Sequence, residues 1–192
     1  MNILIIHAHP NPRSFNQAIL DRVDATLREQ GHATQIHDLY QMQFCCVLDG
    51  EDLLRNWRGN LADDVQREQA AVRWAQGLVL IYPIWWFGPP AILKGWIDRV
   101  FTRKFAFDID AHGMHGLLTH ERALILNTLG GDEATYQREH WHELLVRPIA
   151  EGVLGACGVR NVVYQAFYEV PSIAHAARQT MLDQVGALAA EF

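Results

Sequence analysis

The sequence predicts a doubly wound α/β fold, with a five-stranded parallel sheet between two layers of helices. Short apolar segments rich in β-branched residues recur along the 192 residues, and segments with helical spacing of apolar side chains alternate with them. Such alternation favours parallel strands joined by right-handed crossovers. The chain shows no internal repeat and no linker, so we expect one domain over residues 1–192.

The first elements follow from local composition. "ILIIH" at Ile3–His7 is apolar throughout, which is typical of a strand buried on both faces. Residues 14–30 repeat apolar side chains at helical spacing, and Gly31 ends this helix. Ala33–Leu39 is a less apolar strand, so we expect it nearer an edge of the sheet. Residues 41–60 show no pattern and are expected to be irregular.

The rest of the chain continues the alternation. A helix opens at Pro89 and Pro90, because the missing N–H of proline costs nothing in the first turn. The remaining elements follow from the same spacing rules: helices at 64–75, 141–157 and 172–190, and strands at 78–82, 122–127 and 162–167.

Three loops are expected to meet at one edge of this sheet, because ligands of doubly wound folds bind beyond the carboxyl ends of the strands. The loop 9–16 offers Ser14 as the N-cap of a helix, which suits a phosphate but also an ordinary capped helix. The loop 83–88, "PIWWFG", offers flat aromatic faces beside backbone amides, although its aromatics could equally belong to the core or to an interface.

The third loop, 128–136, begins with "TLGG", where two glycines allow either a close approach to a ligand or a tight turn. Together the three loops favour a planar, phosphorylated cofactor such as a flavin. The sequence contains neither G-x-G-x-x-G nor a Walker A motif, so it supports neither a dinucleotide-type turn nor an NTPase loop.

Composition argues against several other classes of protein. The net charge of −6 is unfavourable for a nucleic-acid partner, and no apolar stretch is long enough for a transmembrane helix. The three cysteines are expected to be free thiols in a reducing cytoplasm. No metal site is expected, because the spacing of the histidines suits no tetrahedral set; these are His112, His115, His120, His140 and His142.

Three segments, "AHPNPRSFN", "YPIWWFGPPAILKGWIDRVF" followed by "FAF", and "TLGGDEATY", resemble the flavodoxin-like NAD(P)H:quinone oxidoreductases. That family includes mammalian quinone reductases, bacterial drug-activity modulators and ancillary proteins of glutathione-gated potassium efflux systems. The resemblance implies a flavodoxin-like fold and a homodimer with two active sites at the interface. It also implies two-electron reduction of quinones or similar flat acceptors by NAD(P)H through a bound flavin.

The resemblance assigns cofactor-binding roles to residues of the three loops and of the last helix. These are His9, Ser14, Phe15 and Asn16 for the phosphates, Pro83, Ile84, Trp85, Trp86 and Phe87 for the flavin ring, Thr128, Gly130, Gly131 and Tyr136 for its pyrimidine side, and Arg178 for the cofactor tail. The flavin is expected to be FAD. FMN is the alternative, because "FCCVL" and the short C-terminus depart from the family pattern. The alternative function is that of a flavin-binding regulator docked on a potassium efflux transporter.

The resemblance makes Tyr136 and His142 the proton relay. Ideal helical spacing would instead pair Tyr136 with His140, four residues later. The segment after "TLGG" has few apolar positions that could hold a helix, so we expect a loop there and choose His142.

Overall fold

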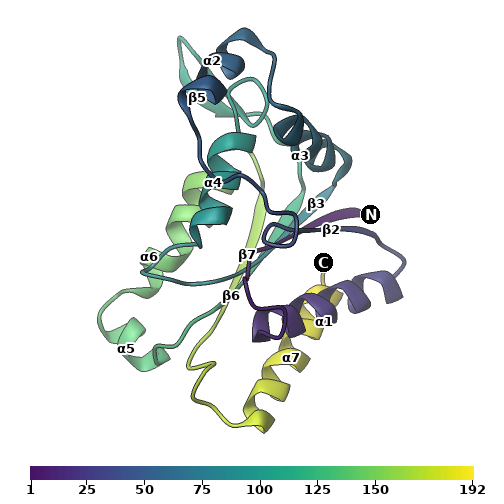
Figure 1. The fold of residues 1–192 in the computed structure, drawn as a ribbon. Coiled ribbons are helices and arrows are strands. Elements are labelled where there is room, and N and C mark those ends of the chain that lie inside the picture. Colours follow the sequence, from purple (N-terminus) through teal and green to yellow (C-terminus); the bar gives the residue numbers. More distant parts are fainter.

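The protein has three layers, in which one parallel sheet lies between two layers of helices (Figure 1). The computed structural model describes all residues from 1 to 192. The order of the strands is β2-β1-β3-β6-β7, all parallel, as expected for a flavodoxin-like fold. The strands are β1 (Asn2–His7), β2 (Ala33–Asp38), β3 (Gly77–Pro83), β6 (Arg122–Thr128) and β7 (Asn161–Phe167). The predicted fold class is therefore confirmed, and the less apolar strand β2 does lie at an edge.

Helices cover both faces of the sheet because the side chains of the central strands are apolar on both faces. On one face α1 (Phe15–Glu29) and α7 (His175–Ala190) pack against each other, over a core that includes Ile3 and Ile5. The opposite face buries Leu4 and Ile6 under a second set of helices. That set comprises α3 (Asp63–Trp74), α4 (Ala91–Val100) and a π-helix, η1 (Arg147–Gly155).

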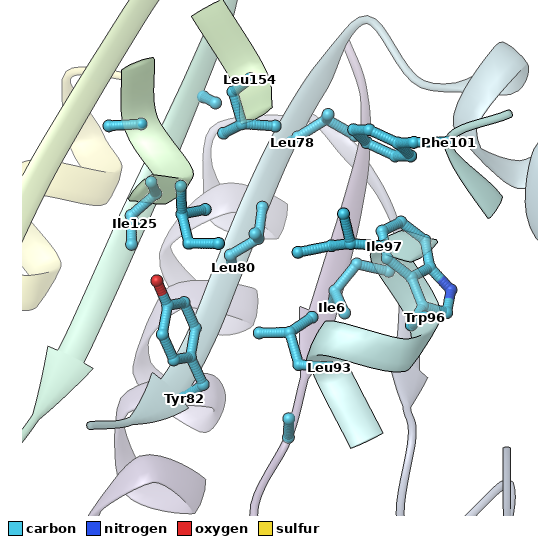
Figure 2. Packing of buried hydrophobic residues seen from close by; sticks show 14 of the residues in the cluster. Ile6, Leu78, Leu80, Tyr82, Leu93, Trp96, Ile97, Phe101, Ile125 and Leu154 are labelled. Carbon is cyan, nitrogen blue, oxygen red and sulfur yellow. The ribbon is translucent and has the colours of Figure 1, made fainter. Parts of the chain in front are cut away.

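The second face holds the larger core (Figure 2), in which α4 presents Leu93, Trp96 and Ile97 to the strands. All three side chains are almost completely buried. Tyr82 is also fully buried here, and Figure 2 shows its hydroxyl pointing toward Ile125 and away from Leu93. This packing fixes α4, and with it the loop that joins β3 to α4.

The expectation of an irregular segment at 41–60 is wrong, because α2 (Gly50–Arg58) lies within it. This helix buries none of its residues and is held by its ends and by one ion-pair network. Asp49 caps it by accepting a hydrogen bond from the N–H of Asp52. The buried guanidinium of Arg99 in α4 then binds Asp52 and Asp64 as well as the carbonyl of Cys45.

The structure differs from the prediction at two further places. An antiparallel hairpin of β4 (Phe107–Asp110) and β5 (Gly113–Gly116) follows α4. The predicted helix at 141–157 is present but divided, since α6 (His142–Val146) continues directly into η1. None of the helices is both long enough and apolar enough to span a bilayer.

The loop expected after "TLGG" is in fact mostly a short helix, α5 (Glu133–Arg138). Asp132 caps it by accepting a hydrogen bond from the N–H of Thr135 at 2.8 Å, which stabilises a helix that has no buried residue. The helix ends before His140, whose φ of 57° is left-handed, so Tyr136 and His140 do not share a continuous helical face.

Candidate active site

The loops that follow the parallel strands enclose a cleft of about 200 Å³ at the carboxyl edge of the sheet. We call it the strand-end cleft. Three of its walls are the predicted loops, and the fourth is the loop after β7, which sequence reasoning missed. The lining residues are His9, Phe15, Asn16, Pro83, Ile84, Trp85, Thr128, Leu129, Gly130, Val170 and Pro171.

The first wall is the start of α1. Ser14 is its N-cap and accepts a hydrogen bond from the N–H of Gln17 at 3.2 Å. The N–H groups of Phe15 and Asn16 precede the first intrahelical bond and have no acceptor in the protein. Free N–H groups at the positive end of a helix dipole form a site for an anion such as a phosphate.

His9 adds a further polar group to this wall. Its Nδ1 lies 3.0 Å from the backbone nitrogen of Asn11 and 3.2 Å from the carbonyl oxygen of the same residue, so Asn11 engages Nδ1 in either neutral tautomer. Burial lowers the pKa of His9, which favours the neutral ring. Nε2 is the ring nitrogen that is left to bond a ligand.

The second wall is a tight turn made by Trp85, Trp86, Phe87 and Gly88. The N–H of Trp85 bonds to the carbonyl of Gly88 at 2.9 Å, and the reverse bond is 3.2 Å long. Both central residues are left-handed, with φ of 50° for Trp86 and 62° for Phe87. Bulky residues rarely adopt this conformation, and such strain concentrates at ligand sites. The turn leaves the N–H groups of Trp86 and Phe87 without acceptors in the protein.

The third wall follows β6. Thr128 and Asn16 are both buried there, and the side-chain amide of Asn16 donates to the Thr128 hydroxyl at 2.6 Å. The carbonyl oxygen of the same Asn16 amide has no partner. Gly131 comes so close to Tyr136 that a Cβ on the glycine would lie 2.6 Å from the ring. The glycine therefore fixes where the Tyr136 ring lies.

An aromatic cluster of Phe87, Tyr136, Trp141 and Tyr168 lies behind the turn. The ring centroid of Tyr136 is 5.9 Å from that of Phe87 and 5.6 Å from those of Trp141 and Tyr168. His142 joins the cluster through Nδ1, which lies 2.7 Å from the hydroxyl oxygen of Tyr168. Burial raises the pKa of Tyr136, so its hydroxyl stays protonated at neutral pH.

Most of the predicted site residues fall into two groups. Eight of them line the strand-end cleft: His9, Phe15, Asn16, Pro83, Ile84, Trp85, Thr128 and Gly130. Phe87, Gly131, Tyr136 and His142 lie in or against the aromatic cluster. Trp86 lines neither and is 95% exposed, so it does not wall the cleft within one chain.

Ser14 and Arg178 act on the cleft indirectly. Ser14 caps the helix that forms one wall. Arg178, in the first turn of α7, donates to the carbonyl of Val170 at 3.1 Å and so holds the fourth loop in place. This loop after β7 could have been predicted in the same way as the other three loops, because β7 also ends at the edge of the sheet where ligands of doubly wound folds bind. Tyr168, which links Tyr136 to His142, begins this loop and was missed for the same reason.

The strand-end cleft and the turn beside it suit a flavin chemically. The cleft has an anion site at the start of α1, and the adjoining turn offers free N–H groups at Trp86 and Phe87, which suit the polar edge of a flat heterocycle. The carbonyl oxygen of Asn16, buried in the cleft wall without a partner, adds an acceptor. No group of three or more histidines, cysteines or carboxylates that could hold a metal ion is present.

The chain is similar to known proteins over nearly its whole length. A family model described as a flavodoxin-like fold matches residues 1–189. An uncharacterized NAD(P)H oxidoreductase of Haemophilus influenzae is 35% identical over 184 residues, which cover 95% of this chain and 91% of that protein. NAD(P)H dehydrogenase (quinone) 1 of Cavia porcellus is 32% identical over 187 residues, covering 87% of this chain and 68% of that protein.

Among solved structures, the NAD(P)H:quinone oxidoreductase of Methanothermobacter marburgensis superposes with a TM-score of 0.89 at 30% identity, covering 99% of this chain and 96% of that one. The chain belongs to the flavodoxin-like family of NAD(P)H:quinone oxidoreductases.

Proposed function

We propose that this protein is a flavin-dependent NAD(P)H oxidoreductase that reduces quinones or similar flat acceptors by two electrons. The observation that carries the proposal is the strand-end cleft, which holds an anion site and a buried amide oxygen and adjoins a turn with two free backbone N–H groups. A bound flavin would accept a hydride from NAD(P)H and pass two electrons to the acceptor. The residues of the chain bind, orient and shield that cofactor.

Binding is assigned wall by wall. The N–H groups of Phe15 and Asn16, together with Nε2 of His9, would hold the phosphate. The strained turn would present the N–H groups of Trp86 and Phe87 to the polar atoms of the ring system. The two left-handed residues cost on the order of 1–3 kcal/mol each, and the surrounding fold offsets that cost in advance, so these donors need no rearrangement when the cofactor binds.

Proton transfer is assigned to Tyr136 and His142. Two-electron reduction of a quinone adds charge to the acceptor, and a nearby hydroxyl or imidazole N–H stabilises that charge and supplies the proton. Tyr136 contacts Phe87 of the turn that would carry the ring, and His142 is linked to Tyr136 through Tyr168. We assign no such role to His140, because it follows the end of α5 and does not share a helical face with Tyr136.

The functional unit is proposed to be a homodimer. The strand-end cleft, at about 200 Å³, is smaller than the roughly 300–1,000 Å³ of complete small-molecule sites, so other surfaces must complete it. Trp86 is 95% exposed beside the cleft, and Trp57 on α2 is 84% exposed. Exposed indoles of this size are typical of surfaces that a partner covers, and a second copy of this chain is the partner we propose.

The experiment that tests the function is steady-state and stopped-flow kinetics of the purified protein with NADH or NADPH and a series of quinones. The proposal expects flavin reduction by the nucleotide and turnover with several flat acceptors. The alternative, a regulator docked on a potassium efflux transporter, predicts bound flavin with negligible turnover and copurification with a membrane protein. Chromatography of the released cofactor distinguishes FAD, which we expect, from FMN.

The dimer is tested by light scattering at micromolar concentration. The proposal expects twice the mass of one chain, and replacement of Trp57 by lysine should shift the protein toward the monomer. A stable monomer with full activity would refute this part of the proposal.

A further inference from the structure

Tyr168 touches both members of the proposed proton relay. It follows β7 and is 8% exposed. Its ring meets that of Tyr136 edge-on, at 5.6 Å and 63°, and its hydroxyl lies 2.7 Å from Nδ1 of His142. Because the loop after β7, α5 and α6 each supply one of these three residues, the hydroxyl joins separate parts of the fold.

The direction of this hydrogen bond decides where the proton of His142 is. Burial, with smaller contributions from Glu133 and Tyr136, raises the pKa of Tyr168 to about 12. The hydroxyl is therefore protonated at neutral pH and can donate to Nδ1. A neutral imidazole that accepts at Nδ1 carries its proton on Nε2. The protein offers Nε2 of His142 no hydrogen-bond partner.

We propose that Tyr168 is a positioning residue, whose hydroxyl donates to Nδ1 of His142 and so holds the imidazole as the Nε2–H tautomer. The His142 imidazole then has a fixed orientation, and a ligand in the site would contact the proton on its Nε2. The tautomer assignment rests on the contact between Tyr168 and His142 and does not depend on the proposed function. Its effect on turnover rests on the proposed function.

The titratable groups around this pair come from three strands and helices. Glu133 and Tyr136 of α5 face Tyr168, while Tyr164 of β7 packs edge-on against the His142 ring at 6.0 Å. Tyr82 of β3 lies next to Tyr164. Burial raises the pKa of both Tyr82 and Tyr164, so neither is ionised at neutral pH and neither competes for the His142 proton.

Tyr164 supplies a matched control. Its ring contacts the same imidazole, but its hydroxyl has no hydrogen-bond partner. Tyr164→Phe and Tyr168→Phe each remove a single oxygen beside His142 and leave a ring in place. Only the second removes a bond to Nδ1.

The tautomer is measured directly by two-bond ¹H–¹⁵N correlation spectra of the purified protein labelled with ¹⁵N-histidine, with the His142 signals assigned by their loss in His142→Ala. We expect an unprotonated Nδ1 and a protonated Nε2 in the wild type and in Tyr164→Phe. In Tyr168→Phe we expect a mixture of tautomers. A protonated Nδ1 in the wild type, or an unchanged pattern in Tyr168→Phe, would overturn the proposal.

The consequence for turnover is measured by stopped-flow reduction of the bound flavin. Loss of one hydrogen bond predicts a reduction rate about five- to tenfold lower in Tyr168→Phe, with flavin content unchanged. Because Tyr168 acts through His142, the same substitution should change nothing further in a His142→Ala background. An equal loss in both backgrounds would overturn the positioning role. If the spectra are as expected but no flavin binds, the proposed function fails while the tautomer assignment stands.

Discussion

Gly131 controls the position of Tyr136 by leaving space that any side chain would fill. A Cβ on Gly131 would lie 2.6 Å from Cε2 of Tyr136, well inside van der Waals contact. At the neighbouring Gly130, a Cβ would lie 3.8 Å from Pro171, which is an ordinary contact. Neither glycine has a left-handed φ, so the backbone accepts alanine at both positions. Gly131→Ala and Gly130→Ala therefore form a matched pair that differs in what the methyl group displaces.

The loss of stability in Gly131→Ala depends on how far the Tyr136 ring can move away from the added methyl group. Overpacking a rigid core costs about 1–3 kcal/mol. The Tyr136 ring is only half-buried and can turn outward, but it then leaves Phe87, Trp141 and Tyr168, and an aromatic pair contributes about 0.5–1.5 kcal/mol. We expect Gly131→Ala to lower the free energy of unfolding by about 1–2 kcal/mol. Gly130→Ala should change it by less than about 0.5 kcal/mol.

Urea unfolding measures the free energies, and near-ultraviolet circular dichroism reports the packing of the aromatic cluster. We expect Gly131→Ala to lose part of the aromatic signal and to reduce its flavin by NAD(P)H about tenfold more slowly, because a displaced Tyr136 no longer assists proton transfer. Wild-type stability together with an unchanged aromatic spectrum in Gly131→Ala would refute the steric argument.

Three further predictions follow from the same structure. His142→Ala should slow flavin reduction in stopped flow by about tenfold or more with flavin still bound, whereas His140→Ala should do little; a larger loss at His140 would contradict the relay. Gly130→Val should abolish flavin binding because branched carbons would fill the strand-end cleft, and wild-type flavin stoichiometry would count against this. Arg99→Met should lower the free energy of unfolding by about 2–3 kcal/mol, since it leaves acidic partners of the buried guanidinium unpaired. Burial alone would raise the pKa of Asp64, but the bond and charge of Arg99 hold it below its ordinary value. This contribution is complete above about pH 4 and is lost as the pH falls further, so urea unfolding of Arg99→Met should show a weaker acid dependence.

The sheet was predictable because its strands carry their own signal. β1, β3 and β6 are apolar segments buried on both faces, whereas the polar residues of β2 indicate a position at the edge of the sheet. Ser14 was recognisable as a cap from its place before an apolar repeat. Residues at the ends of these strands were therefore placed correctly at one edge of the sheet.

Short helices without buried residues were not predictable from apolar periodicity. α2 and α5 bury nothing, so the signal for each was its cap: Asp49 before α2 and Asp132 before α5. α2 further depends on the bond from Arg99 to Asp52, which are 47 residues apart in the sequence. The same limit applies to the contacts of Tyr168, since a hydrogen bond across 26 residues leaves no local pattern.

The most direct test of the whole account is the visible absorption spectrum of the purified protein, followed by titration with FAD and FMN. The free N–H groups at the start of α1 and in the adjoining turn, together with the family of the chain, predict the bands of oxidised flavin, with one flavin bound per chain. A colourless protein that binds neither added FAD nor added FMN would contradict the central claim, whatever its fold.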